Sequence, residues 1–335
     1  MRPLICLAGA GCLAFLGGGT ARAACGLEKV TQMPLLSLGR HYVVMVGLED
    51  VTRPMEVDTG AATTLLKSSV AKELSLKVDE VAAHARPMIG FGQTSADFHL
   101  NVIPSELALG DLVFHDRSTF VATMDEGNVP EQASIGLLGD DILSQYDVEF
   151  DFPSHLLTFY RAIGCYDTFL PWLGPYAAIP FDHRNDKVTI DIMLNHERTR
   201  AIVDTGNDIS FISKSAAALW GASMADITPI KASLRSPLNR GGAMPIGVYP
   251  FESVTIGGDV FPDMKMRVVD VDFSPASANL GLDYWSRRKV WISYPREWLF
   301  VAEDPARAKL AYPVNPAPAA PAPKPSPLAQ AAGPN

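Results

Sequence analysis

The residues best suited to chemistry are two carboxylates, Asp58 and Asp204, each of which begins an Asp-Thr-Gly motif. The glycine of each motif allows backbone angles closed to other residues, so we expect each carboxylate in a tight turn at the end of a strand. If the two turns meet, the carboxylates cannot both ionise easily. One pKa then rises, the other falls, and the pair holds a single proton over a range of pH. Such a pair offers one general acid beside one general base.

The two motifs occupy equivalent places in an internal repeat. Residues 43–66 (VVMVGLEDVTRPMEVDTGAATTLL) align without a gap with residues 189–212 (TIDIMLNHERTRAIVDTGNDISFI), a shift of 146 residues from position 58 to position 204. Apolar residues alternate around each motif, which is typical of half-buried strands. A single Asp-Thr-Gly is most simply a capped turn, whereas two at equivalent positions of a repeat indicate a shared site.

The repeat resumes downstream with small changes in its shift, as expected when surface loops differ in length. The matched pairs are Glu106–Gly110 with Ser253–Gly257, Leu138–Asp141 with Leu280–Asp283, and Val148–Pro153 with Val290–Pro295. Each copy ends in a further apolar strand, at residues 156–160 and 298–301. Two short helices are expected soon after the motif strands, at residues 68–74 and 214–220.

This pattern predicts an all-β protein with short helices, in which two homologous lobes pack as a pseudo-dimer. The 335 residues are enough for about two domains. We expect the lobes at residues 34–163 and 176–304, with an aromatic-, Gly- and Pro-rich linker at residues 164–175. Residues 312–335 are rich in Pro and Ala, a composition that cannot bury a core, and are expected to form a disordered tail.

The motifs resemble those of the retropepsin and pepsin superfamily of aspartic peptidases, in the bacterial-type arrangement of two retropepsin-like lobes in one chain. The resemblance covers most of residues 40–303. It is strongest at Ile135–Leu143, which is followed by Tyr146–Phe152, and looser at Asn279–Trp285. It implies the acid-protease fold with two pepsin- or retropepsin-like lobes.

The resemblance also implies an endopeptidase in which Asp58 and Asp204 form the catalytic dyad and activate a water, without a metal or an organic cofactor. The residues expected to support the dyad are Thr59 and Thr205, which would bond across the lobe interface, the motif glycines Gly60 and Gly206, and Gly139 and Gly281, which would pack behind the motif turns.

A β-hairpin flap that closes over the substrate is a further feature of the family. The expected flap and substrate residues are Ile89, Gly90, Phe91 and Gly92 in the first lobe, and Arg240, Gly241 and Gly242 in the second. The first segment also fits an ordinary hairpin turn, and the choice between the two hairpins as the working flap stays open.

Two residues depart from the family pattern. Asn207 stands where a small Ala or Ser usually follows the motif glycine, and Asp208 adds a third carboxylate nearby. A catalytically inactive peptide-binding or scaffold protein on the same fold is therefore the alternative to a peptidase. A third possibility is an active dimer in which each lobe pairs with its twin in another chain. We favour a monomer, because linked lobes meet at high effective concentration.

The first 23 residues are typical of a signal peptide. Arg2 precedes an apolar run at residues 4–16, and Ala-Arg-Ala at residues 21–23 fits a cleavage site. We therefore expect export to the periplasm or secretion, with an uncleaved N-terminal membrane anchor as the alternative.

Beyond this segment the chain contains two cysteines, Cys25 and Cys165, which are expected to form a disulfide in an oxidising compartment. Two unpaired buried thiols, or a lipid on Cys25, are the alternatives.

Other classes of function find little support. The net charge of −9 argues against nucleic acid as a partner, because phosphate binding requires a basic surface. The sequence contains no His-Glu-x-x-His or Cys-x-x-Cys metal motif and no Gly-x-Ser-x-Gly nucleophile turn. The expected partner is a peptide or protein substrate.

Overall fold

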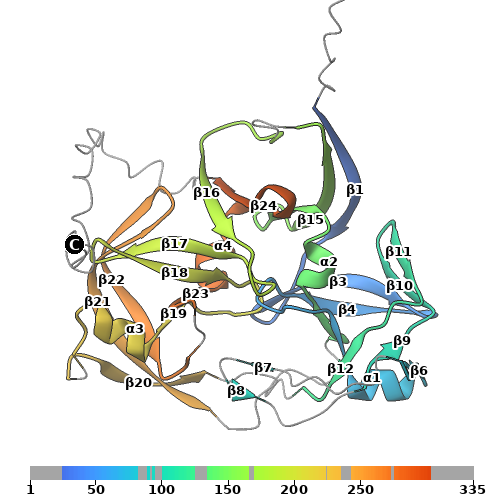
Figure 1. Cartoon of the computed structure of the whole chain (residues 1–335), viewed down its shortest axis with the longest axis horizontal. Helices are drawn as coiled ribbons and strands as arrows, with labels where there is room; N and C mark the ends of the chain where they lie inside the picture. The colour runs from blue at the N-terminus through green and yellow to red at the C-terminus, as the bar shows by residue number, and fades with distance from the viewer. Residues whose placement is uncertain are drawn as a thin grey trace, which may run out of the picture.

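The computed structural model describes residues 25–81, 89–90, 93–94, 100–124, 134–165, 170–223, 225–234, 243–272 and 275–302. The predicted signal peptide and the predicted tail lie outside these residues. The described residues form two β-lobes that flank a sheet to which both contribute (Figure 1).

Alternation of apolar residues explains the strands that lead into the first motif. In β3 (His41–Leu48), Val44 and Val46 are fully buried, whereas Met45 between them is 41% exposed. Strand β3 pairs antiparallel with β4 (Val51–Val57), which ends directly before the first motif. One face of this hairpin therefore packs into the core of the lobe, and its end presents the motif turn.

The first lobe is an eight-stranded sheet in the order β11-β10-β3-β4-β13-β5-β12, with β2 beside β3. Its other strands are β2 (Leu36–Leu38), β5 (Leu65–Lys67), β10 (Glu106–Leu109), β11 (Leu112–His115), β12 (Phe120–Ala122) and β13 (Gly136–Leu138). Two small antiparallel pairs accompany it, β6 (Lys77–Val78) with β9 (Val102–Ile103) and β7 (Ile89–Gly90) with β8 (Gln93–Thr94).

The second lobe repeats this arrangement with longer strands, and its sheet closes through a pairing of β17 with β21. The strands are β17 (Thr189–Leu194), β18 (Glu197–Val203), β19 (Phe211–Ser213), β20 (Thr228–Leu234), β21 (Met244–Ile256), β22 (Asp259–Val269) and β23 (Ala278–Leu280). In the first lobe β13 runs parallel to β4 and antiparallel to β5, and in the second β23 runs parallel to β18 and antiparallel to β19.

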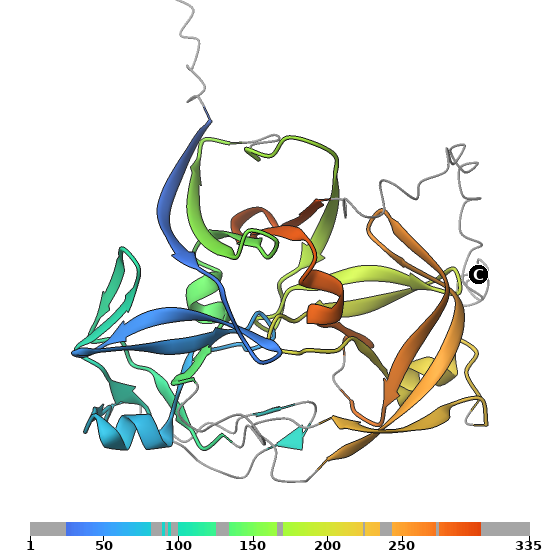
Figure 2. The same ribbon diagram turned by 180° about the vertical axis from the view of Figure 1, so that it is seen from behind.

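Both lobes contribute three strands to an antiparallel sheet between them, in the order β1-β15-β14-β24-β25-β16 (Figures 1 and 2). These strands are β1 (Gly26–Pro34), β15 (Leu156–Ile163), β14 (Asp147–Asp151), β24 (Lys289–Ser293), β25 (Trp298–Ala302) and β16 (Tyr176–Asp182). At the centre Glu149 lies opposite Trp291, its own counterpart in the repeat. The axis that relates the two lobes therefore passes through this pair.

The helices are short. The two that were predicted form as α1 (Ser68–Glu73) and α3 (Lys214–Leu219), and two others, α2 (Asp140–Leu143) and α4 (Leu282–Trp285), follow equivalent glycines. Among the described residues no helix is both long and apolar enough to cross a membrane. The prediction of an all-β protein with two homologous lobes is confirmed.

The predicted disulfide between Cys25 and Cys165 is present. It joins the residue before β1 to the segment after β15, and these two strands pair along their length. The linker residues Leu170 and Trp172 pack against Trp291 on the shared sheet. Strand β1, which precedes the expected start of the first lobe, is thereby tied to the interface.

Candidate active site

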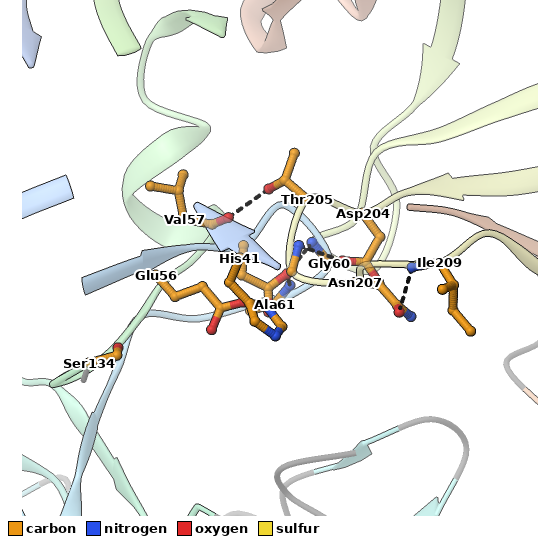
Figure 3. Close-up of polar contacts among 12 residues, drawn as sticks. His41, Glu56, Val57, Gly60, Ala61, Ser134, Asp204, Thr205, Asn207 and Ile209 are labelled. Carbon is orange, nitrogen blue, oxygen red and sulfur yellow. Dashed lines mark hydrogen bonds and ion pairs between the residues drawn. The ribbon is translucent and has the colours of Figure 1, made fainter. Parts of the chain in front are cut away.

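The two motif turns meet at the lobe interface through their threonines. The hydroxyl of Thr59 accepts a hydrogen bond from the Thr205 backbone N–H (3.0 Å) and donates one to the carbonyl of Val203 (2.7 Å). The hydroxyl of Thr205 does the same in reverse, accepting from the Thr59 N–H (3.1 Å) and donating to the carbonyl of Val57 (2.7 Å; Figure 3). Because both threonines are buried, these four bonds lock the two strand ends together.

Each motif carboxylate lies against the glycine of the opposite motif. A Cβ atom on Gly206 would stand 2.3 Å from Cγ of Asp58, and one on Gly60 would stand 2.5 Å from Cγ of Asp204. Only a residue without a side chain leaves this space. The sequence motif therefore has a tertiary reason: the glycine of each lobe makes room for the carboxylate of the other.

Backbone N–H groups hold the inner carboxylate oxygens. Asp58 Oδ1 accepts hydrogen bonds from Gly60 (2.8 Å) and Ala61 (3.1 Å), and Asp204 Oδ1 accepts one from Gly206 (2.9 Å). Asp58 is half-buried and Asp204 is 6% exposed. The two acidic groups are thus fixed by the turns that carry them.

The pKa of Asp58 is raised well above its usual value. Burial is the largest cause, followed by the negative charges of Asp204 and Glu56, and the hydrogen bond from Gly60 opposes them. A carboxyl in this setting keeps its proton beyond the pH at which an exposed aspartate loses it. Asp58 is therefore suited to hold a proton in the way that a general acid requires.

Asp204 has a side-chain partner that Asp58 lacks. Nδ2 of Asn279, on β23, donates a hydrogen bond to Asp204 Oδ2 (2.6 Å), and Asn279 is 3% exposed. The counterpart of Asn279 on β13 is Leu137, which is apolar. The resemblance to the family did not identify Asn279. The only signal in the sequence was an Asn in an otherwise apolar strand next to a motif strand.

Equivalent glycines pack behind both turns, as expected. Cβ atoms built on Gly139 and Gly281 would stand 2.5 Å from the Thr63 carbonyl carbon and 2.6 Å from the Ile209 carbonyl oxygen. A hydroxyl accepts a hydrogen bond from each glycine N–H and contacts an aspartate of the following helix. In the first lobe these are Thr64 and Asp141, and in the second Ser210 and Asp283.

Sequence reasoning did not single out these hydroxyl and aspartate pairs behind the motif turns, although the repeat contains a pattern that marks the hydroxyls. The ungapped alignment places Thr64 on Ser210, so both copies carry a hydroxyl six residues after the motif aspartate. Arg117 and Arg267 each donate to the helix aspartate of their own lobe, with both distances at 2.8 Å. The bonds brace the turns from behind.

A His–Glu pair lies beside the first motif (Figure 3). Nδ1 of His41 is 2.6 Å from Oε1 of Glu56, which is 8% exposed and two residues before Asp58 on the chain. The hydrogen bond with Glu56 is the main cause that raises the pKa of His41, against a lowering by burial. Sequence reasoning did not single out this pair, because position 202 in the second copy is an isoleucine and the repeat gives it no counterpart.

The two departures from the family pattern differ in their contacts. Asp208 receives an ion pair from Arg40 of the first lobe (2.8 Å), so its charge is balanced across the interface. Asn207 is 5% exposed, its Oδ1 accepts from the Ile209 N–H (3.4 Å), and its Nδ2 has no hydrogen-bond partner among the described residues. Neither side chain is bonded to Asp58 or Asp204 in the described part of the chain.

The predicted flap segments are only partly within the described residues. Ile89 and Gly90 form strand β7, which pairs with β8 as a hairpin. In Figures 1 and 2 this hairpin lies between the lobes, on the side opposite the shared sheet. Phe91 and Gly92 lie outside the described residues, as do Arg240, Gly241 and Gly242.

No cluster of three or more His, Cys, Asp or Glu side chains suited to hold a metal ion occurs in the described ranges. The polar groups that contact the motif carboxylates include backbone amides and one asparagine amide. Such a set can hold and move protons.

Comparisons of the chain with family models and with solved structures found similar proteins. The family model for aspartyl protease matches residues 44–142, the part of the first lobe that carries the first motif and the glycine behind it. No curated protein sequence matches the chain. Among solved structures, the aspartic proteinase from Irpex lacteus matches at 18% sequence identity and a TM-score of 0.49, covering 84% of this chain and 98% of that one. The match to the family model agrees, within the first lobe, with the predicted resemblance to the pepsin and retropepsin superfamily.

Proposed function

We propose that this member of the pepsin- and retropepsin-like superfamily is an aspartic endopeptidase that uses Asp58 and Asp204 as its catalytic dyad. The observation that carries the proposal is the meeting of the two motif turns across the lobe interface. Each carboxylate lies against the glycine of the other turn, and crossed threonine bonds hold both in place.

The proposed reaction needs one proton shared by two carboxyls. The ionised aspartate acts as general base and takes a proton from a water, whose oxygen attacks the carbonyl carbon of the scissile peptide bond. The protonated aspartate donates a hydrogen bond to the carbonyl oxygen, and a proton then passes to the leaving nitrogen as the C–N bond breaks. Preorganised backbone N–H groups at Asp58 and Asp204 keep both carboxyls oriented without rearrangement.

The proposed substrate is an extended peptide segment of a protein. An extended chain between the motif turns and the β7–β8 hairpin would present its carbonyls to the dyad and its backbone to the hairpin, as in recognition by strand addition. We further propose that one chain is sufficient, because it contains both motifs. Export to the periplasm or the medium is part of the proposal, supported by the N-terminal apolar run and the disulfide.

The test is peptide cleavage by residues 24–335, measured by mass spectrometry on a mixed peptide library from pH 3 to pH 8. We expect cleavage by the wild type, with the rate falling toward high pH as both carboxyls ionise. We expect Asp58→Asn and Asp204→Asn each to abolish cleavage while retaining the folded circular dichroism spectrum. Folded wild-type protein that cleaves nothing at any pH would favour a peptide-binding protein on the same fold.

A mixing experiment separates a single-chain site from a site built by twin lobes of two chains. In a twin-lobe dimer, Asp58→Asn retains a complete Asp204 pair and stays active. In a single-chain enzyme, each variant is inactive alone, and an equimolar mixture of the two remains inactive. Activity of either single variant at high protein concentration would reject the single-chain site.

A further inference from the structure

The hydrogen bonds around the two aspartates are not symmetric. Each aspartate accepts two N–H bonds, but those of Asp58 both come from the backbone and both reach Oδ1, from Gly60 and Ala61. Asp204 accepts one backbone bond, from Gly206 to Oδ1, and one side-chain bond, from Asn279 to Oδ2. Among the described residues no N–H contacts Oδ2 of Asp58, and the first-lobe counterpart of Asn279 is Leu137, which cannot donate.

An amide donor in this place stabilises a charged carboxylate. A hydrogen bond to an ionised group is stronger than one to a neutral group, and burial strengthens it further. The amide of Asn279 is 3% exposed and its Nδ2 stands 2.6 Å from Asp204 Oδ2. The contact with Asn279 therefore favours the charged form of the Asp204 carboxyl, whereas no N–H group among the described residues contacts Oδ2 of Asp58.

We propose that Asn279 is a positioning residue that keeps Asp204 ionised and leaves the single proton of the dyad on Asp58. The inference rests on the proposed function, in which Asp204 then serves as the general base and Asp58 as the general acid. It deepens that function by giving each of two sequence-identical motifs a different role.

The orientation of the Asn279 amide agrees with an ionised Asp204. An amide that turned its Oδ1 toward the carboxylate would need a proton on Asp204, because two acceptors do not bond. In the observed orientation Oδ1 has no hydrogen-bond partner among the described residues, so the donation from Nδ2 is the one polar contact of this buried side chain.

Charged and titratable groups also face the dyad from neighbouring elements. They are Glu56 at the end of β4, His41 at the start of β3, Asp208 in the second motif loop with its partner Arg40, and the buried hydroxyl of Tyr294. The negative charge of Glu56 acts on Asp58 and opposes its ionisation, which raises the pKa of Asp58. The charges of Glu56 and Asp208 are each paired with a basic group, and neither pair contacts Asp204.

The decisive experiment titrates the two carboxyls directly. Carboxyl carbon shifts of ¹³C-labelled aspartates are followed by NMR from pH 3 to pH 8 in the wild type, with Asp58→Asn and Asp204→Asn used to assign the two signals. We expect Asp204 to ionise first. In Asn279→Leu, which installs the residue type of the first lobe, we expect the lower of the two pKa values to rise by about one unit, a tenfold change in acidity.

A matched control removes a buried asparagine away from the dyad. Asn101 in the first lobe donates to Ser118 Oγ (2.9 Å), and Asn101→Leu should leave both dyad titrations unchanged. If the leucine variant does not fold, Asn279→Ala removes the same amide without added bulk. The acid limb of the kcat/KM profile should move to higher pH in the same Asn279 variant, a shift that a purely structural residue would not produce.

Two results would overturn the inference. One is an unchanged lower pKa in folded Asn279→Leu or Asn279→Ala, and the other is ionisation of Asp58 before Asp204 in the wild type. The titration does not depend on turnover. A wild type that cleaves no peptide but shows the expected NMR shifts would reject the proposed function and retain the assignment of the proton. A wild type that cleaves peptides but lacks those shifts would reject the assignment of the proton and retain the proposed function.

Discussion

The two motif aspartates depend on each other's glycine. Asp58 lies against Gly206 and Asp204 against Gly60, at distances that leave no room for a methyl group. This exchange of space places the two carboxyls beside each other. The pKa of Asp58 is raised first by burial and then by the negative charge of Asp204.

A methyl group at Gly206 should disturb the chemistry more than the fold. In Gly206→Ala the Cβ would stand 2.3 Å from Cγ of Asp58, so that carboxyl must move. We expect kcat/KM to fall by about 100-fold or more, because displacing a catalytic group by about 1 Å costs that much. Gly258→Ala is the control, since a Cβ there would meet only Ala177 at 3.9 Å. Equal activities of the two variants would contradict this account.

The ends of the motif strands are closed by the opposite lobe. Strand β4 ends at Val57 and β18 ends at Val203, and the last carbonyl of each accepts from a threonine hydroxyl of the other lobe. A strand end in an isolated lobe would leave these groups to water. At the interface these two carbonyl groups have hydrogen-bond partners only when both lobes are in place. The threonine hydrogen bonds between the lobes therefore specify how the lobes align.

Removal of one threonine hydroxyl tests this arrangement. Thr59→Val leaves the Val203 carbonyl and the Thr205 N–H without their partner in a buried place. We expect a loss of about 1–3 kcal/mol of stability in urea unfolding for a buried group left unsatisfied. Thr59→Ser retains the hydroxyl and should retain most of the stability. A serine variant as unstable as the valine variant would assign the effect to the lost methyl group instead.

At the scale of the whole molecule, contacts of different kinds join the lobes. The shared sheet crosses the axis at Glu149 and Trp291, and the motif turns cross it again at the threonines. The ion pair between Arg40 and Asp208 adds a third contact near the site. Since strands β14 and β24 pair directly, the lobes are fixed relative to one another by backbone hydrogen bonds.

The disulfide should contribute to global stability without a role in chemistry. It spans 140 residues of chain and ties β1 to the segment beyond β15. The double variant Cys25→Ser/Cys165→Ser should lose about 2–5 kcal/mol of stability, as is typical when a native disulfide is removed. Its kcat/KM at low temperature should match that of the wild type, because the disulfide lies outside the dyad. Full stability after removal, measured by thermal unfolding, would contradict the expectation.

A further contact between the lobes, an ion pair that includes a histidine, should respond to pH. Nε2 of His183, at the end of β16, is 2.8 Å from Oδ2 of Asp140, at the start of α2 in the first lobe. The hydrogen bond with Asp140 raises the pKa of His183 above its usual value, against a lowering by burial. The stabilisation is therefore complete below about pH 6.5, the usual value for histidine, and is lost as the pH rises through the raised pKa.

We expect His183→Gln to lower the unfolding free energy at pH 6 more than at pH 9, because only the wild type gains a charged pair at pH 6. Unfolding curves of both proteins across this range provide the measurement. His115→Gln is the control, since His115 contacts a backbone carbonyl and no carboxylate among the described residues, and its effect should not vary with pH. A His183 variant whose loss of stability is the same at both pH values would disprove the charged contact.

The repeat in the sequence determined the architecture and the two acidic residues. Because the same pattern occurs twice at matched spacing, the strands around residues 43–66 and 189–212, the short helices after them and the pair Asp58 and Asp204 follow from the chain alone. Local patterns suffice for these strands, since strand alternation acts between near neighbours. The cysteine pair was predicted in the same way, from its number and its expected compartment.

Only the tertiary structure decided what makes the two halves different. Asn279 comes next to Asp204 across a strand pair, and His41 meets Glu56 within a hairpin of the first lobe. These contacts join residues that carry no shared motif, so no spacing in the sequence marks them. The repeat predicts equal aspartates, whereas one buried amide from β23 and one buried carboxylate from β4 give them unequal surroundings. The position of the proton depends on such contacts, because the electrostatic interaction between two charges depends on their distance in space and not on their separation along the chain.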